Sequence, residues 1–294
     1  MIKNVDCPYK ELNCDLNNCE CAKYKAWRKA SNQTEVKNKL DEMNINIEQD
    51  LLSLILTMQK MFISKFHKVD DLTDEEVDIW VDRYLVCIED EVREAREHLK
   101  YYEFNDLNEK EFKKEIIDIL HFVANLFIMG KSNIKLISEK YFKLYDNNIV
   151  KVKDLIDFIY NNVENRTCLY SKEEILKELN DNKDKLFDNN YQSLITADDK
   201  TYFNFQGLNY TNILMLILLN NLLDSCGKVR QQINWKFWKS QKKKIDYDKL
   251  NECFAEVLLS LMIIFKSINC SPDQIKDIYI KKNMENIFRQ EFNY

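Results

Sequence analysis

Glycine and proline are almost absent from this chain: three Gly and two Pro occur in 294 residues. Tight turns and sheets rely on both, because Gly reaches positive φ values and Pro fixes φ in turns. Leu, Ile, Lys, Glu and Asn are abundant instead, which is typical of long helices joined by short polar segments. We therefore expect an all-α fold, with a core large enough for one domain or two.

The charge and the apolar segments limit the classes of function. The net charge of −6 argues against a general nucleic-acid-binding protein, because phosphate binding requires a basic surface. The first residues, MIKNVDCPYK, lack the apolar core of a signal peptide. Residues 201–223 carry no charge, but Asn and Gln interrupt them, so we expect a buried helix and not a membrane span. These patterns predict no nucleic-acid or membrane partner, and a cytoplasmic or other reducing location.

Apolar periodicity predicts the helices. Thr73 and Glu76 form a capping box before the second helix, Gly130 ends the third, and Ser271-Pro272 begins the last. We expect four segments: a Cys-rich arm at 1–47, a catalytic half at 48–148, a connector or insertion at 149–207, and a second half at 208–294. The helices are expected at about 50–67, 74–103, 109–130, 132–147, 210–233, 246–268 and 272–292.

Nine Cys occur, and they fall into two groups. In a chain expected to lie in a reducing compartment, thiols or metal ligands are favoured over disulfides. Cys87, Cys168, Cys226, Cys253 and Cys270 are scattered, mostly in apolar surroundings, and we expect small core residues there. The arm contains a cluster that would suit structural Zn2+ or an iron–sulfur cluster, the alternative being a reduced arm that caps the domain. This cluster consists of Cys7, Cys14, Cys19 and Cys21.

The two halves echo each other. A helix, an aromatic cluster, a polar joint and an apolar helix occur in the first half and again in the second. We expect a helical bundle of two pseudo-repeated helical hairpins. The carboxylates are not repeated, since the counterpart of Asp118 is Ala255. Chemistry is therefore expected in one half only.

Two pairs of carboxylates point to a metal site. Glu115 and Asp118 lie three residues apart in KKEIIDILHF, a run otherwise rich in Ile, Leu and Phe. At this spacing they share one helix face, and carboxylates buried without cations are costly. Glu91 and Glu94 repeat the spacing in the preceding helix, which would fold back against the first pair. Four converging carboxylates suit Mg2+ or Mn2+; the alternative is a solvated face with ion pairs.

The last helix collects cations and amides at helical spacing. Its sequence is YIKKNMENIFRQEFNY, in which Asn replaces better helix formers. A merely solvated face does not explain that choice. The residues on this face are Lys282, Asn283, Asn286, Arg289 and Tyr294.

The ordered motifs resemble a known family, the dimeric all-α dUTPases of the all-α NTP pyrophosphohydrolase superfamily, relatives of the MazG-type enzymes. The resemblance covers about residues 48–148 and 208–294. The Cys arm and residues 150–205 have no place in the family pattern. The matching motifs are E-x-x-E at Glu91/Glu94, E-x-x-D-x-x-H-F at Glu115–Phe122, K-N-x-x-N-x-x-R-Q at Lys282–Gln290, and the dipeptide Met58-Gln59.

The resemblance implies Mg2+-dependent hydrolysis of dUTP to dUMP and pyrophosphate, by a homodimer. The four carboxylates would bind Mg2+, Lys282 and Arg289 would hold phosphates, and Gln59 and His121 would face the base or sugar. Asn283, Asn286 and Tyr294 would complete the nucleotide pocket.

Two alternatives remain open at this point. Within the same class, the substrate could be dCTP or several dNTPs, because the motifs do not show how the pyrimidine is recognised. In another class, the chain could be a catalytically silent helical interaction protein. The intact set of four carboxylates argues against the second alternative.

Overall fold

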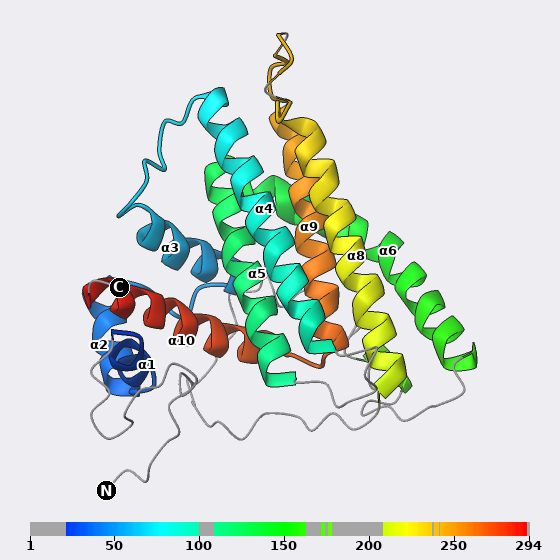
Figure 1. Ribbon diagram of the computed structural model, residues 1–294, viewed down its shortest axis with the longest axis horizontal. Helices are drawn as coiled ribbons and strands as arrows, with labels where there is room; N and C mark the ends of the chain where they lie inside the picture. Colours follow the sequence, from blue (N-terminus) through cyan, green and yellow to red (C-terminus); the bar gives the residue numbers. More distant parts are fainter. Residues whose placement is uncertain are drawn as a thin grey trace, which may run out of the picture.

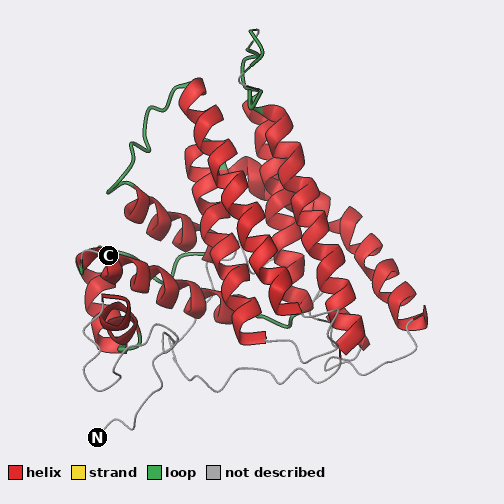
Figure 2. Ribbon diagram, viewed as in Figure 1, coloured by secondary structure: helices red, strands yellow, loops and turns green. Residues whose placement is uncertain are grey.

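The structure is a computed structural model that describes residues 22–99, 109–162, 172–173, 176–177, 208–236, 238–240 and 242–292. Within these ranges every regular element is a helix and no strand occurs (Figure 2), so the all-α expectation is confirmed. The helices are α1 (Ala22–Ala30), α2 (Gln33–Glu42), α3 (Leu51–Ile63), α4 (Asp74–Leu99), α5 (Glu109–Met129), α6 (Ile134–Asn162), α8 (Leu208–Gln232), α9 (Tyr247–Ser267) and α10 (Pro272–Glu291).

A bundle of α4, α5, α8 and α9 forms the centre of the molecule (Figure 1). Helix α4 packs mainly against α5, and α8 packs mainly against α9. Helix α6 covers α9, and α3 lies against α5. Helix α10 turns by 106° from α9, crosses the lower end of the bundle in Figure 1, and contacts α1, α3 and α5. This crossing brings the C-terminal helix to the same face of α5 as the N-terminal helices.

Local signals set the starts of two helices. The Thr73 backbone N–H donates to Glu76 Oε2 over 2.7 Å, and the Glu76 N–H donates to Thr73 Oγ1 over 3.2 Å. Ser271 and Gln274 make the same reciprocal pair before α10, whose first residue is Pro272. Each pair satisfies donors that a helix N-terminus leaves without intrahelical partners. Both predicted starts are confirmed.

The end of α5 follows a different mechanism from the one expected. Gly130 does follow the last helical residue, but the left-handed conformation belongs to Lys131, with φ of 53°. The Ser132 N–H donates to the Phe127 carbonyl over 3.0 Å, which completes the C-terminal motif around Lys131. Gly130 is required for space, since a Cβ there would lie 2.4 Å from Phe254 Cζ.

Two segments are more regular than the sequence predicted. Helix α6 continues to Asn162, although residues after 149 were expected to form a connector. In the expected N-terminal arm, α1 and α2 are helices, and α1 packs on α10. Ala26 is fully buried in this contact, and Lys39 Nζ lies 2.7 Å from Glu291 Oε1. The arm therefore includes a part that is packed against the body.

The apolar helices of the second half are buried within one chain. Leu214, Leu218 and Leu222 of α8 are at most 2% exposed. Among the described residues, no single helix is long and apolar enough to cross a membrane, and only α9 and α10 together, across their sharp bend, reach that threshold. These apolar side chains of α8 are thus covered within one chain. The homodimer and the pseudo-repeat of the two hairpins stay predictions.

Gly130, just after α5, and Gly227, within α8, differ in the space around them, and this difference allows a paired test of the packing. We expect Gly130→Ala to lower the free energy of unfolding by about 1–3 kcal/mol, because the new methyl group must displace the buried Phe254 ring. Gly227→Ala, with nothing within 4 Å of the new Cβ, should raise it by about 0.5–1 kcal/mol. Urea denaturation of both variants measures the difference; equal effects would contradict the packing around Gly130.

Candidate functional site

Carboxylates from α4 and α5 converge where these two helices face each other. One oxygen from each of Glu91, Glu94 and Glu115 lies within 4.8 Å of the other two. Glu91 and Glu115 are half-buried, and Glu94 is exposed. Asp118 lies one turn along α5 from Glu115, and its charge acts on both Glu91 and Glu115. The structure therefore brings together three of the four carboxylates that the sequence paired in twos, and Asp118 lies near enough for its charge to act on two of them.

The acidic cluster, formed by Glu91, Glu94 and Glu115, differs from the other acidic residues on α4 in its partners. Glu89 Oε1 lies 2.6 Å from Arg230 Nη1, and Glu97 Oε1 lies 2.8 Å from Arg93 Nη1. Within the described part of the chain, Glu91 has no such basic partner, and its side-chain hydrogen bond is to Glu115. A solvated, ion-paired face describes Glu89 and Glu97 but not Glu91.

Proton affinities reflect this crowding. Burial, and then the charges of Asp118, Glu115 and Glu94, raise the pKa of Glu91 to about 8. Burial and the charge of Asp118 also raise the pKa of Glu115, against a lowering by the Glu91 hydrogen bond, Lys282 and His98. His98 Nε2 lies 3.5 Å from Glu115 Oε1. Without a cation the cluster therefore retains a proton at neutral pH.

The donor set fits a hard divalent cation. Carboxylate oxygens are the ligands of Mg2+, which binds at about 2.0–2.1 Å, so opposite ligands are about 4.2 Å apart. Three ligands cannot all lie opposite one another, and adjacent ligands of an octahedral ion are about 3 Å apart. Oxygens within 4.8 Å of one another must therefore move inward by side-chain rotation to bind one ion. Glu91, Glu94 and Glu115 are the residues that would hold the ion, with Asp118 beside them.

Helix α10 supplies a cation to this cluster. Lys282 Nζ donates to Asp118 Oδ2 over 2.8 Å. Burial lowers the pKa of Lys282, but the charge of Asp118 and this hydrogen bond outweigh the burial and raise it. Arg289, two turns further on, is ion-paired with Glu285, and its charge also acts on Lys282. Asn286 lies between them on the helix and is half-buried.

A buried polar cluster lies between α3, α5 and α10. Gln59 Oε1 accepts from Tyr279 OH over 2.9 Å and from Asn283 Nδ2 over 3.1 Å. The Nε2 of Gln59 donates to Asn125 Oδ1 over 2.9 Å. Gln59 is thus fixed by three polar partners, and it is 2% exposed. Sequence reasoning missed Asn125 and Tyr279, although each lies four residues from a predicted site residue, His121 and Asn283 respectively.

His121 links this polar cluster to the carboxylates. Its ring stacks on Tyr279 with centroids 4.2 Å apart, and its Nδ1 donates to the Ile117 carbonyl over 2.8 Å. Burial lowers the pKa of His121 to about 4 despite the nearby Asp118, so the ring is neutral at pH 7 and Nε2 is an acceptor. Within the described residues, His121 Nε2 and Asn283 Oδ1 are buried acceptors without a hydrogen-bond partner.

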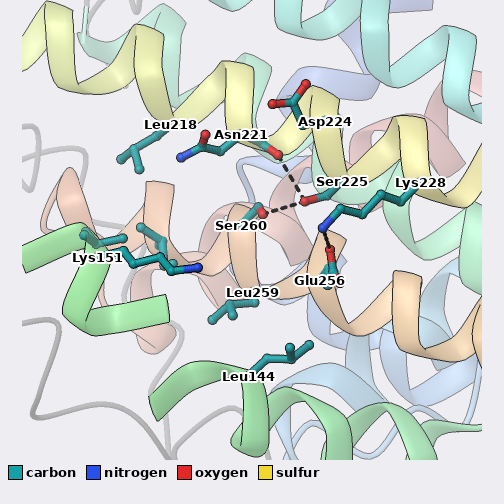
Figure 3. A pocket seen from close by; sticks show the side chains of 12 residues that line it. Leu144, Lys151, Leu218, Asn221, Asp224, Ser225, Lys228, Glu256, Leu259 and Ser260 are labelled. Carbon is teal, nitrogen blue, oxygen red and sulfur yellow. Dashed lines mark hydrogen bonds and ion pairs between the residues drawn. The ribbon is translucent and has the colours of Figure 1, made fainter. Parts of the chain in front are cut away.

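The second half of the bundle has different chemistry at the corresponding interface. A cavity of about 610 Å³ lies between α6, α8 and α9, and Figure 3 shows its lining. Ser225 Oγ and Ser260 Oγ are 3.0 Å apart there, and Lys228 is ion-paired with Glu256. These charges neutralise each other, and no carboxylate of the acidic cluster lines this cavity. The expectation that chemistry lies in one half only stays a prediction.

Some predicted residues lie outside the described ranges. They are Tyr294, Cys168 and the four Cys of the arm, Cys7, Cys14, Cys19 and Cys21. Their roles stay predictions. The remaining cysteines are free thiols: Cys226, Cys253 and Cys270 are buried and Cys87 is half-buried, so most of them are core residues as expected.

Comparison of the chain with protein-family models, with curated proteins and with solved structures gave no match. The function is therefore inferred from the geometry of the site and from the sequence motifs.

The raised pKa of Glu91 predicts how stability depends on pH in metal-free protein. Because the folded pKa of about 8 lies above the ordinary 4.5, the protonated group stabilises the fold below pH 4.5. This contribution is lost as the pH rises through 8. We expect Glu91→Gln to raise the free energy of unfolding by about 1–2 kcal/mol at pH 9, the half-exposure of the side chain limiting the gain.

The same variant should gain much less at pH 5, because Glu91 is then still protonated in the folded protein and this pH lies only just above the ordinary pKa of 4.5 that governs the unfolded chain. Urea denaturation at both pH values, with a chelator present, measures this difference. The exposed Glu139 on α6 provides the control, Glu139→Gln. A gain that is equal at pH 5 and pH 9 would contradict mutual repulsion in the cluster.

Proposed function

We propose that this protein hydrolyses dUTP to dUMP and pyrophosphate with Mg2+. The observation that carries the proposal is the cluster of Glu91, Glu94 and Glu115, in which Glu91 and Glu115 are half-buried and Glu91 has no Lys or Arg partner among the described residues. Such a cluster destabilises the fold when ionised, so its position suggests a role for a bound cation. The order of the motifs around it, which resembles the all-α dUTPases, supplies the substrate.

The residues around the cluster support phosphoanhydride chemistry. A water oxygen forms a bond to the α-phosphorus while the bond from that phosphorus to the bridging oxygen breaks, and pyrophosphate leaves. Bound Mg2+ would neutralise phosphate charge and lower the pKa of the attacking water. Lys282 and Arg289, on one face of α10, would hold the phosphates beyond the cleaved bond. Lys282 contacts Asp118 directly and Arg289 lies two turns further along the same helix, so the leaving pyrophosphate would be held on the α10 side of the cluster.

The polar cluster suggests where the nucleoside would bind. His121 Nε2 and Asn283 Oδ1 are buried acceptors that suit donors such as a sugar hydroxyl or a base N–H. Because Gln59 is fixed by Tyr279, Asn283 and Asn125, the orientation of the Asn283 amide is fixed as well. Uracil N3–H and the cytosine amino group both supply donors, so dCTP or a broader set of dNTPs is the alternative substrate.

Substitution of one carboxylate tests the reaction. We expect purified protein to release pyrophosphate from dUTP only with Mg2+ or Mn2+, and Glu115→Gln to lower kcat by at least ~100-fold because the metal site loses a ligand. Glu115→Gln should be as stable as the wild type or more so, since repulsion falls. The control Glu139→Gln should retain full activity.

The assay must include dUTP, dUDP, dCTP and the other dNTPs. A higher kcat/KM for dCTP than for dUTP would identify dCTP as the preferred substrate within the same class. No turnover of any nucleotide with either metal would contradict the enzyme and favour a silent interaction protein. Full activity of Glu115→Gln would show instead that the catalytic metal site lies elsewhere.

The ion pair between Lys282 and Asp118 predicts a competition that binding measurements can detect without turnover. Lys282 Nζ lies 2.8 Å from Asp118 Oδ2. A metal ion that binds beside Asp118 must therefore compete with the positive charge of Lys282. We expect Lys282→Met to bind Mn2+ about 3- to 10-fold more tightly, while dUTP hydrolysis falls. Isothermal titration calorimetry measures the affinity. Lys135→Met, at an exposed lysine on α6, is the control. Weaker Mn2+ binding by Lys282→Met than by the wild type would contradict competition between Lys282 and the metal ion.

A further inference from the structure

The segment between α8 and α9 concentrates positive charge in an otherwise acidic chain. Residues 233–245, the α8–α9 loop, contain five lysines and no acidic residue, whereas the whole chain has a net charge of −6. The same loop contains Trp235 and Trp238. Interleaved Lys and Trp in so short a segment are not needed for a turn between two helices. The site proposed above makes no use of them.

The loop projects beyond the ends of α8 and α9, away from α10 (Figure 1). Ile233 and Ile245 are buried at its two ends. Between them, the Asn234 Nδ2 donates to the Lys243 carbonyl and the Lys243 N–H donates to Asn234 Oδ1, each over 2.8 Å. These reciprocal bonds hold the base of the loop closed.

The N-terminus of α4 supports the base of the loop. Asp78 accepts from the Asn234 backbone N–H over 2.9 Å and from its Nδ2 over 3.0 Å. Lys242 Nζ lies 2.9 Å from Glu75 Oε1. The acidic residues of α4 thus position the loop and neutralise Lys242. Lys239, Lys243 and Lys244 are exposed, and their side chains have no ion pair among the described residues.

Trp238 is the most exposed large apolar side chain in the described part of the protein, with 62% of its surface accessible. Its ring meets Trp235 at 90°, with centroids 5.7 Å apart, and Lys236 Nζ lies 4.9 Å from the Trp235 ring centroid. Exposure of so much apolar ring surface to water costs free energy, and a binding surface that covers the ring would recover it. Trp is also the side chain that prefers the interface between water and lipid.

We propose that the α8–α9 loop docks the protein onto an anionic lipid surface. Trp238 would enter the headgroup region while Lys239, Lys243 and Lys244 contact anionic headgroups, each basic residue adding to the attraction. The earlier expectation of no membrane partner depended on the lack of an uninterrupted apolar segment that could span a bilayer, and surface docking by this loop requires no such segment. Docking by the tip keeps the acidic bundle away from the negative surface.

The shape of the loop favours a lipid surface over single-stranded nucleic acid. Proteins that bind single strands use a basic groove along which successive bases stack on successive aromatic rings. Among the described residues of the α8–α9 loop, Trp238 is the one exposed ring, and the neighbouring helix α4 is rich in acidic residues, which would repel a nucleic-acid strand. A planar surface can meet such a tip without approaching the rest of the chain.

Vesicle sedimentation with the full chain tests the proposal. We expect binding to phosphatidylcholine–phosphatidylserine vesicles that weakens with added NaCl, and little binding to phosphatidylcholine alone. Lys239→Glu/Lys244→Glu should weaken binding at least ~10-fold, and Trp238→Ala should also weaken it. The control Lys37→Glu/Lys135→Glu changes the total charge equally at exposed lysines of α2 and α6, and should bind as the wild type does. Circular dichroism and dUTP hydrolysis confirm that each variant is folded.

Three results would overturn the proposal. The first is no binding of the wild type to vesicles containing phosphatidylserine. The second is equal binding by the wild type and the Lys239→Glu/Lys244→Glu variant. The third is binding of oligo(dT) that depends on the same lysines and displaces the protein from vesicles, which would identify the loop as a single-strand-binding element.

Discussion

The burial of α5 is the constraint on which the rest of the structure depends. This helix packs against α3, α4, α9 and α10, and Ile116, Ile119 and Leu120 are almost fully covered. A helix enclosed on so many sides leaves little surface for charge, yet Glu115 and Asp118 lie on it. They face the gap toward α4 and α10, where Glu91 and Lys282 approach. The same packing that stabilises the bundle therefore creates the electrostatic cost at the site.

Two kinds of polar group lie beside α5, and they differ in how fully their hydrogen bonds and charges are satisfied. Gln59 has three of its four side-chain hydrogen-bonding positions occupied, by Tyr279, Asn283 and Asn125. The carboxylates have the opposite character, since Glu91 and Glu115 compete for a proton. A fixed polar framework next to an unbalanced charge cluster is the arrangement that binding of a charged ligand requires, because the framework does not have to reorganise.

Local features of the fold could be predicted from the sequence, and long-range contacts could not. The capping boxes at Thr73 and Ser271 depend on residues three positions apart, so their sequence signature is sufficient. The convergence of Glu91 with Glu115 followed from two helix faces joined by a short segment. By contrast, the bond from Gln59 to Asn125 and the packing of α1 on α10 join distant parts of the chain, and no spacing in the sequence indicates them. Gly130 is intermediate: its place was predicted, but its reason, the Phe254 ring, is a tertiary contact.

The packing of α1 against α10 has a consequence for the chain as it is synthesised. Lys29 lies over the rings of Phe288 and Phe292, and Lys39 pairs with Glu291, so the first described helices dock on the last one. During translation, α1 and α2 emerge long before α10 exists. Ala26, which is fully buried in the folded protein, therefore has no α10 to pack against until that helix has been synthesised. Docking of α1 and α2 is thus a late step in the assembly of the fold, and it must follow the synthesis of the central bundle.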